Sequence, residues 1–125
     1  MAELRFSMET HGTAVVVSAH GELDITSSQR FDDRLSEAAA ASNQIILDMS
    51  AVDFMDTTAL AVIVTHWRLA AEEGGVFLLA GARYRYTKAL WITGLADRLP
   101  MYDTVGEALT ALAEAGPGGR DPATP

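Results

Sequence analysis

Val52-Asp53-Phe54-Met55-Asp56-Thr57-Thr58-Ala59-Leu60-Ala61-Val62-Ile63-Val64 is the stretch that decides the fold of this 125-residue chain. An aspartate precedes two hydroxyl residues and an almost wholly apolar run, which is the pattern of a capped helix. Asp56 or Thr57 can accept hydrogen bonds from the first-turn N–H groups, so we expect the helix to begin at about Thr57 or Thr58. The hydroxyl of Thr58 is then placed at a helix N-terminus, beside a carboxylate. Helical spacing predicts an inward face made of Leu60, Val64, Trp67 and Ala71, widened by Ile63 and Ala70.

A short apolar run precedes this helix and predicts a buried strand over residues 44–50. A strand, a short loop and a capped helix form one βα unit, and loops at the carboxyl ends of parallel strands commonly hold functional sites. An Asp-Thr-Thr sequence can equally be a plain helix cap. Both explanations stay open at this point.

The N-terminal part predicts a hairpin and a helix. Alternating residues over 4–9 place Leu4, Phe6 and Met8 on the inward face of a strand, and a turn at His11 and Gly12 leads to a second strand over residues 13–19. Thr26 and Gln29 fit a capping box, which predicts a helix to about Ala41 with Phe31, Leu35 and Ala38 inward.

The C-terminal part predicts a buried strand over residues 76–80 and a short helix over about 84–93, with Tyr86, Leu90 and Trp91 inward. Gly94 suits the left-handed position after that helix. A short extended piece is expected over 99–102, and Thr104 with Glu107 forms a capping box for a last helix. We expect one domain over residues 1–115 and a disordered tail over 116–125, because the tail is rich in glycine and proline.

These elements predict an α/β fold. The expected sheet is mostly parallel with four to five strands and an antiparallel N-terminal edge strand, and about four helices cover it.

Composition excludes several classes of function. The chain has no cysteine, a net charge of −8 and one lysine, Lys88, so thiol chemistry and general nucleic-acid binding are not expected. No apolar run approaches the roughly 20 residues of a membrane span, and no signal peptide is evident, which favours a cytoplasmic protein. No phosphate-binding loop, zinc motif or nucleophile elbow occurs. We therefore expect neither an enzyme nor a bound metal or cofactor.

One alternative site is carried by four aspartates, Asp24, Asp48, Asp53 and Asp56, which follow or end predicted strands. Carboxylates so placed could form a magnesium-dependent phospho-acceptor site, as in response-regulator receivers. A receiver has an acidic pair after its first strand and a lysine at the end of its last, and this chain has neither. The acidic residues are more simply explained as solvated loop residues.

Two motifs resemble a known family. The first is Gly21-Glu22-Leu23-Asp24, and the second runs from Ile46 through Asp56-Thr57-Thr58-Ala59 to Leu60. At this spacing they are similar to the STAS domain of bacterial anti-sigma factor antagonists, and the resemblance covers roughly residues 4 to 113. It implies the STAS fold.

The resemblance also implies a mechanism. Such an antagonist binds an anti-sigma factor that is a serine/threonine kinase of the histidine-kinase-like ATPase fold, and so frees the sigma factor. The kinase inactivates it by phosphorylating the second hydroxyl residue of the motif, and a phosphatase restores it. On this chain the implied acceptor is Thr58, with Thr57 second. The implied partner-binding residues are Asp24, Asp56, Met55, Ala59 and Leu60.

The motif departs from the usual Asp-Ser-Ser-Gly of the family. Threonines replace both serines and Ala59 replaces glycine. Each change adds a methyl group, while the hydroxyls are kept. A constitutive, unphosphorylated STAS scaffold, or a subunit of a signalling or transport assembly, therefore remains the alternative to a phosphorylation switch.

Overall fold

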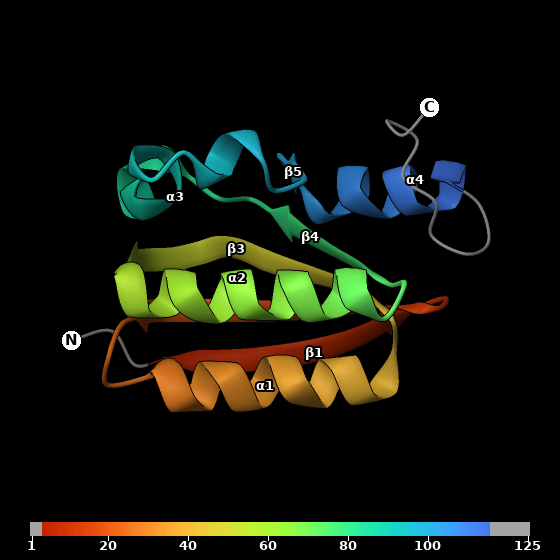
Figure 1. The fold of residues 1–125 in the computed structure, drawn as a ribbon, viewed down its shortest axis with the longest axis horizontal. Coiled ribbons are helices and arrows are strands. Elements are labelled where there is room, and N and C mark those ends of the chain that lie inside the picture. The colour runs from red at the N-terminus through yellow and green to blue at the C-terminus, as the bar shows by residue number, and fades with distance from the viewer. Residues whose placement is uncertain (1–3, 116–125) are drawn as a thin grey trace.

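The computed structural model describes residues 4–115, in which five strands form one sheet in the spatial order β1-β2-β3-β4-β5 (Figure 1). β1 pairs antiparallel with β2, and the other neighbouring strands are parallel. The predicted sheet with an antiparallel N-terminal edge strand is thus confirmed. The strands are β1 (Arg5–His11), β2 (Ala14–Leu23), β3 (Gln44–Met55), β4 (Val76–Ala80) and β5 (Met101–Tyr102).

The helices lie on both faces of the sheet. Because the parallel strands advance in one direction, right-handed crossovers place α1 and α2 on the same face. α4 follows β5 and packs on the opposite face (Figure 1). The α-helices of residues 4–115 are α1 (Ser28–Ala41), α2 (Thr57–Glu72), α3 (Lys88–Ile92) and α4 (Val105–Ala115), with short 3₁₀ turns η1 (Tyr84–Tyr86) and η2 (Leu95–Asp97).

Two cores result from the alternation of side chains along each strand. Ile45 and Leu47 of β3 pack into the core beneath α1 and α2, whereas Ile46 between them joins the core beneath α4. The second core involves Ala14 and Val16, in the first half of β2. The carboxyl ends of β2 and β3 therefore lie outside the area that α4 covers.

The inward face of α2 is rotated from the predicted one. Its buried residues are Ala59, Leu60, Ile63 and His66, whereas Ala71 is exposed and Val64 and Trp67 are only partly buried. The prediction is confirmed for Leu60 and Ile63, which are buried, and it is wrong for Ala71. It did not include His66. The ring of His66 is 5% exposed, and Nε2 lies 2.7 Å from Asp32 Oδ1 on α1, so a polar partner allows the imidazole to be buried.

The start of α1 also differs from the prediction. Ser27, not Thr26, occupies the N-cap position, and no side chain caps the helix. The amide and hydroxyl of Thr26 instead donate to Asp24 Oδ1 at 2.9 and 2.6 Å. Gln29 donates to Asp33 rather than reaching back to the cap. The predicted capping box does not form, because Thr26 is engaged in a turn closed by Asp24.

Some element boundaries differ from the predicted ones, while α2 begins at Thr57 as expected. β3 continues to Met55, so a single residue, Asp56, joins it to α2. The helix expected over 84–93 is divided into η1 and α3 at Thr87, whose buried hydroxyl donates to the Arg83 carbonyl. Gly94 adopts the predicted left-handed conformation, with φ +80°. Met8, expected to point inward, is 37% exposed, whereas Phe6 of the same edge strand packs against the core as expected.

The expected tail over 116–125 lies outside the described residues. Within residues 4–115, none of the helices has the length and apolar character needed to cross a membrane.

Candidate functional site

The ends of β2 and β3 bring the two sequence motifs side by side. Leu23 pairs with Met55 in the parallel ladder, so Asp24 and Asp56 begin neighbouring loops. The amide of Asp56 donates to the Leu23 carbonyl at 3.0 Å, which extends the pairing by one residue. The candidate site at the carboxyl edge of the sheet consists of the β2–α1 turn and the first turn of α2, at the left end of the molecule in Figure 1.

Asp56 is the centre of the hydrogen bonds in this region. Its Oδ1 caps α2 by accepting from the amides of Thr58 and Ala59 at 2.9 and 3.1 Å. The same oxygen accepts from the Thr58 hydroxyl at 2.5 Å. Its other oxygen, Oδ2, accepts from the amide of Ile25 at 3.1 Å. One carboxylate therefore caps the helix, orients the candidate acceptor hydroxyl and joins two loops.

The environment of Asp56 acts on its acidity in two directions. Burial alone raises the pKa of a carboxyl group, because the charged form loses hydration. The hydrogen bonds from Thr58, Ala59 and Ile25 favour the carboxylate and together outweigh burial, so the pKa of Asp56 lies below its ordinary value of 3.8. Asp56 is consequently ionised at neutral pH and acts there only as an acceptor.

Asp24 shapes the neighbouring loop, and its carboxylate accepts hydrogen bonds from Thr26 and Ser27 rather than from Thr58. Its Oδ1 accepts from the amide and hydroxyl of Thr26, while its carbonyl accepts from the Ser27 amide at 3.0 Å. The Ser27 hydroxyl donates to the Glu22 carbonyl at 3.2 Å, which ties the turn back to β2. Asp24 and Asp56 therefore occupy adjacent loops, and the direct link between these loops passes through Ile25.

The comparisons with known proteins agree with this architecture. A model described as the STAS domain matches residues 5–108, which is most of the chain. The chain belongs to the STAS domain family.

Several proteins that are similar to this chain are named anti-sigma factor antagonists. The chain is 30% identical over 111 residues to the anti-sigma F factor antagonist of Paenibacillus polymyxa, covering 87% of this chain and 95% of that one. It is 26% identical over 111 residues to the anti-sigma-F factor antagonist RsfA of Mycobacterium tuberculosis, covering 86% and 87%. A crystal structure of an anti-sigma factor antagonist from Mycobacterium paratuberculosis has a TM-score of 0.81 at 24% identity, covering 89% and 95%. This last likeness confirms the STAS fold.

The two threonines of the STAS motif differ in their surroundings. Thr57 is exposed, whereas Thr58 is partly buried and donates its hydroxyl to Asp56. Both belong to the first turn of α2. The Thr58 hydroxyl is therefore held in place by a hydrogen bond, whereas Thr57, on the same turn, is more exposed.

Three residues expected at the partner surface are buried in the core. Met55, Ala59 and Leu60 are 3%, 0% and 6% exposed, because the end of β3 and the inward side of the first turns of α2 join the same core. Their side chains support the loop from below and present almost no surface to a partner. The partner-binding role that the resemblance implies for them stays a prediction.

Two exposed apolar residues, one directly after the first STAS motif and one within the second, were not predicted from the sequence. Ile25 is 71% exposed and follows Asp24, and Phe54 is 48% exposed and precedes Met55. Between the pairs Gly21–Val52 and Glu22–Phe54 the ladder shifts, which leaves Asp53 as an extra residue in β3. The bulge explains why simple alternation fails at Phe54. The exposure of Ile25 could have been predicted from its position between an Asp and a Thr, which are residues typical of a surface turn.

The four-aspartate magnesium site is not assembled. Asp48 accepts from Ser18 Oγ and from the Ser50 amide, away from the Asp56 cap. Over residues 4–115, no group of three His, Cys, Asp or Glu side chains is arranged to hold a metal ion.

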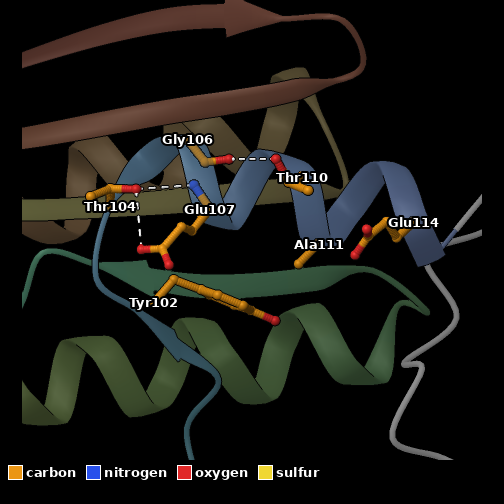
Figure 2. Close-up of a pocket in the computed structure, with 7 residues that line it drawn as sticks. All are labelled: Tyr102, Thr104, Gly106, Glu107, Thr110, Ala111 and Glu114. Carbon is orange, nitrogen blue, oxygen red and sulfur yellow. Dashed lines mark hydrogen bonds between the residues drawn. The ribbon is translucent and has the colours of Figure 1, made fainter.

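A shallow groove runs along α4, on the sheet face opposite α2. Within it, Thr104 Oγ1 accepts from the Glu107 amide at 3.1 Å and faces the Glu107 carboxylate at 3.4 Å, so the predicted cap of this helix is confirmed (Figure 2). The Thr110 hydroxyl donates to the Gly106 carbonyl. These polar groups serve the helix itself. The lining residues are Tyr102, Thr104, Gly106, Glu107, Thr110, Ala111 and Glu114.

Proposed function

We propose that this chain is an anti-sigma factor antagonist whose switch residue is Thr58. It binds an anti-sigma factor in the cytoplasm and thereby frees a sigma factor. The observation that supports this most directly is the hydroxyl of Thr58, held by Asp56 at the start of α2 in a STAS domain whose relatives are named antagonists. Thr57 is the second candidate acceptor.

The partner in this proposal is an anti-sigma factor that is also a serine/threonine kinase with the histidine-kinase-like ATPase fold. It phosphorylates Thr58 and ends the interaction, and a serine/threonine phosphatase reverses the modification. The kinase supplies ATP binding and catalysis, so the chain itself is a substrate and a binding module rather than an enzyme. This partner assignment follows from the family resemblance.

A phosphate on Thr58 acts at the interface more than on the fold. It adds about −1.5 to −2 charges at neutral pH. A helix N-terminus tolerates an anion and stabilises it by ~0.3–1 kcal/mol. The same charge lies beside the Asp56 carboxylate and has to be desolvated against a surface that accepts a neutral hydroxyl. Release of the partner therefore does not require unfolding.

The alternative is a constitutive STAS scaffold, or a subunit of a signalling or transport assembly. Two observations favour it. The Thr58 hydroxyl is already engaged by Asp56, and the Ala59 methyl is fully buried where the family motif has glycine. Both features make the motif less open to a kinase than a serine followed by glycine.

A calorimetric titration separates these functions. The purified chain is titrated into each histidine-kinase-like anti-sigma factor of the source genome, as wild type, Thr58→Glu and Thr57→Glu. We expect one anti-sigma factor to bind, Thr58→Glu to lose at least about tenfold in affinity, and Thr57→Glu to lose less. Binding that Thr58→Glu leaves intact supports the constitutive scaffold, and an absence of binding to any anti-sigma factor contradicts the antagonist.

A further inference from the structure

The carboxylate of Asp56 accepts hydrogen bonds from two different elements, the first turn of α2 and the β2–α1 turn. Oδ1 receives the Thr58 hydroxyl at 2.5 Å, and Oδ2 receives the Ile25 amide at 3.1 Å. Ile25 belongs to the β2–α1 turn and exposes 71% of its surface. A change at the Thr58 hydroxyl therefore reaches an exposed apolar side chain on another element through one intervening residue.

Phosphorylation alters the first of these bonds directly. The Oγ1–H bond of Thr58 is broken and an Oγ1–P bond forms, while ADP leaves with the electron pair of the β–γ bridging bond and the proton passes to the kinase or to water. The ester oxygen has no hydrogen to donate to Asp56. A doubly charged group now lies within a few ångströms of a carboxylate, and the two repel each other.

The phosphate also competes with Asp56 for the backbone amides at the start of α2. Those of Thr58 and Ala59 donate to Asp56 Oδ1. A phosphate at the same helix N-terminus is a stronger acceptor for such N–H groups. Displacement of Oδ1 from the cap moves the whole carboxylate, so Oδ2 cannot keep its position on the Ile25 amide.

We propose that Asp56 is a positioning residue that transmits the chemical state of Thr58 to the Asp24–Ser27 turn and so controls how Ile25 is presented to the partner. This proposal rests on the function proposed above and specifies its regulation. In the unmodified protein, Asp56 holds the turn against the start of α2. In the phosphorylated protein, the turn loses that support.

The turn can respond as a unit because its internal hydrogen bonds do not involve Asp56. Asp24 binds Thr26, and Ser27 binds the Asp24 and Glu22 carbonyls. These contacts preserve the local shape when the Ile25–Asp56 bond breaks. A shift of the turn then moves the Ile25 side chain without unfolding α1.

The coupling is measured on the isolated chain, without any partner. Amide hydrogen exchange is followed by NMR in the wild type, Asp56→Asn, Thr58→Glu and Thr57→Glu. The asparagine keeps one carbonyl oxygen for the helix cap but offers an NH₂ group where the Ile25 amide needs an acceptor. Thr57→Glu adds the same charge to the same turn of α2, from an exposed residue whose side chain makes no hydrogen bond to the Asp56 carboxylate.

We expect Asp56→Asn to raise the exchange rate of the Ile25 amide about tenfold or more, because a bond to a carboxylate is lost. The Thr58 and Ala59 amides should change by less than about threefold, because Asn caps as well as Asp. Thr58→Glu should raise the Ile25 rate in the same way, while Thr57→Glu should not. Melting temperatures of all four proteins show that each is folded.

The proposal is overturned if Asp56→Asn leaves the Ile25 rate unchanged, or if Thr57→Glu and Thr58→Glu raise it equally. Neither outcome depends on a kinase or an anti-sigma factor. Conversely, a confirmed Ile25 response in a protein that binds no anti-sigma factor would reject the antagonist role while leaving the positioning role of Asp56 intact.

Discussion

At the scale of single residues, Asp56 illustrates how burial and hydrogen bonding oppose each other. Burial raises the pKa of its carboxyl group, and the bonds from Thr58, Ala59 and Ile25 lower it further than burial raises it. The sequence predicted Asp56 or Thr57 as the cap of α2, because both residue types are strong helix starters, and in the structure the cap is Asp56. The bond to Ile25 was not predictable, because it depends on the pairing of β2 with β3.

The lowered pKa of Asp56 predicts a pH dependence of stability. A carboxyl group whose pKa is lower in the folded state stabilises the fold above its unfolded pKa, and this contribution is lost as the pH falls through the folded pKa. The difference in unfolding free energy between wild type and Asp56→Asn should be largest near pH 6 and shrink below pH 3.8. Urea unfolding at pH 6, 4 and 3 measures it. A difference that grows on acidification would contradict the assignment.

Ile25 provides a second prediction at this scale. Ile25→Ser should weaken binding to the anti-sigma factor by about tenfold or more, as for an apolar residue at the centre of an interface. Its stability should change by less than about 0.5 kcal/mol, because the side chain is 71% exposed. Leu69→Ser is the matched control, since Leu69 is 45% exposed on the second half of α2. Equal losses for both variants would show that Ile25 has no special role.

At the scale of elements, α1 and α2 are joined by a buried polar contact as well as by their apolar faces. His66 and Asp32 lie 2.7 Å apart, with the histidine 5% exposed. Helical periodicity predicted where α2 begins and that Leu60 and Ile63 face inward, but it did not include His66. The burial of His66 depends on a partner 34 residues away. Pattern arguments within one helix have no access to such a partner.

The contact between His66 and Asp32 should contribute measurably to the free energy of unfolding. His66→Ala should lower the unfolding free energy by about 1–3 kcal/mol, because a buried hydrogen bond is removed and a cavity is left. Chemical denaturation measures the loss. His11→Ala is the control, because His11 pairs with Glu9 in an exposed position and should change stability by less than about 1 kcal/mol. A loss for His66→Ala no larger than for His11→Ala would show that the buried contact adds nothing.

At the scale of the whole molecule, the two cores and the functional edge occupy different parts of the sheet. Alternating strand and helix patterns were sufficient to predict the parallel sheet and its antiparallel edge strand, because a crossover helix joins parallel strands, whereas a short turn joins the antiparallel pair β1 and β2. The family motifs marked Asp24, Asp56 and Thr58, which the fold brings to one edge. They could not mark Met55, Ala59 and Leu60 as buried, nor Ile25 and Phe54 as exposed. Those distinctions depend on the β-bulge and on the packing beneath α2.

The central claim is that Thr58 is the switch residue of an anti-sigma factor antagonist, and phosphorylation mapping tests it most directly. Wild type, Thr58→Ala and Thr57→Ala are incubated with the anti-sigma kinase that binds the chain and with ATP, and intact mass and fragment spectra are recorded. We expect one phosphate on Thr58 in the wild type and in Thr57→Ala, and none in Thr58→Ala. Equal phosphorylation of Thr58→Ala and wild type, or no phosphorylation of any of the three proteins, would contradict the claim.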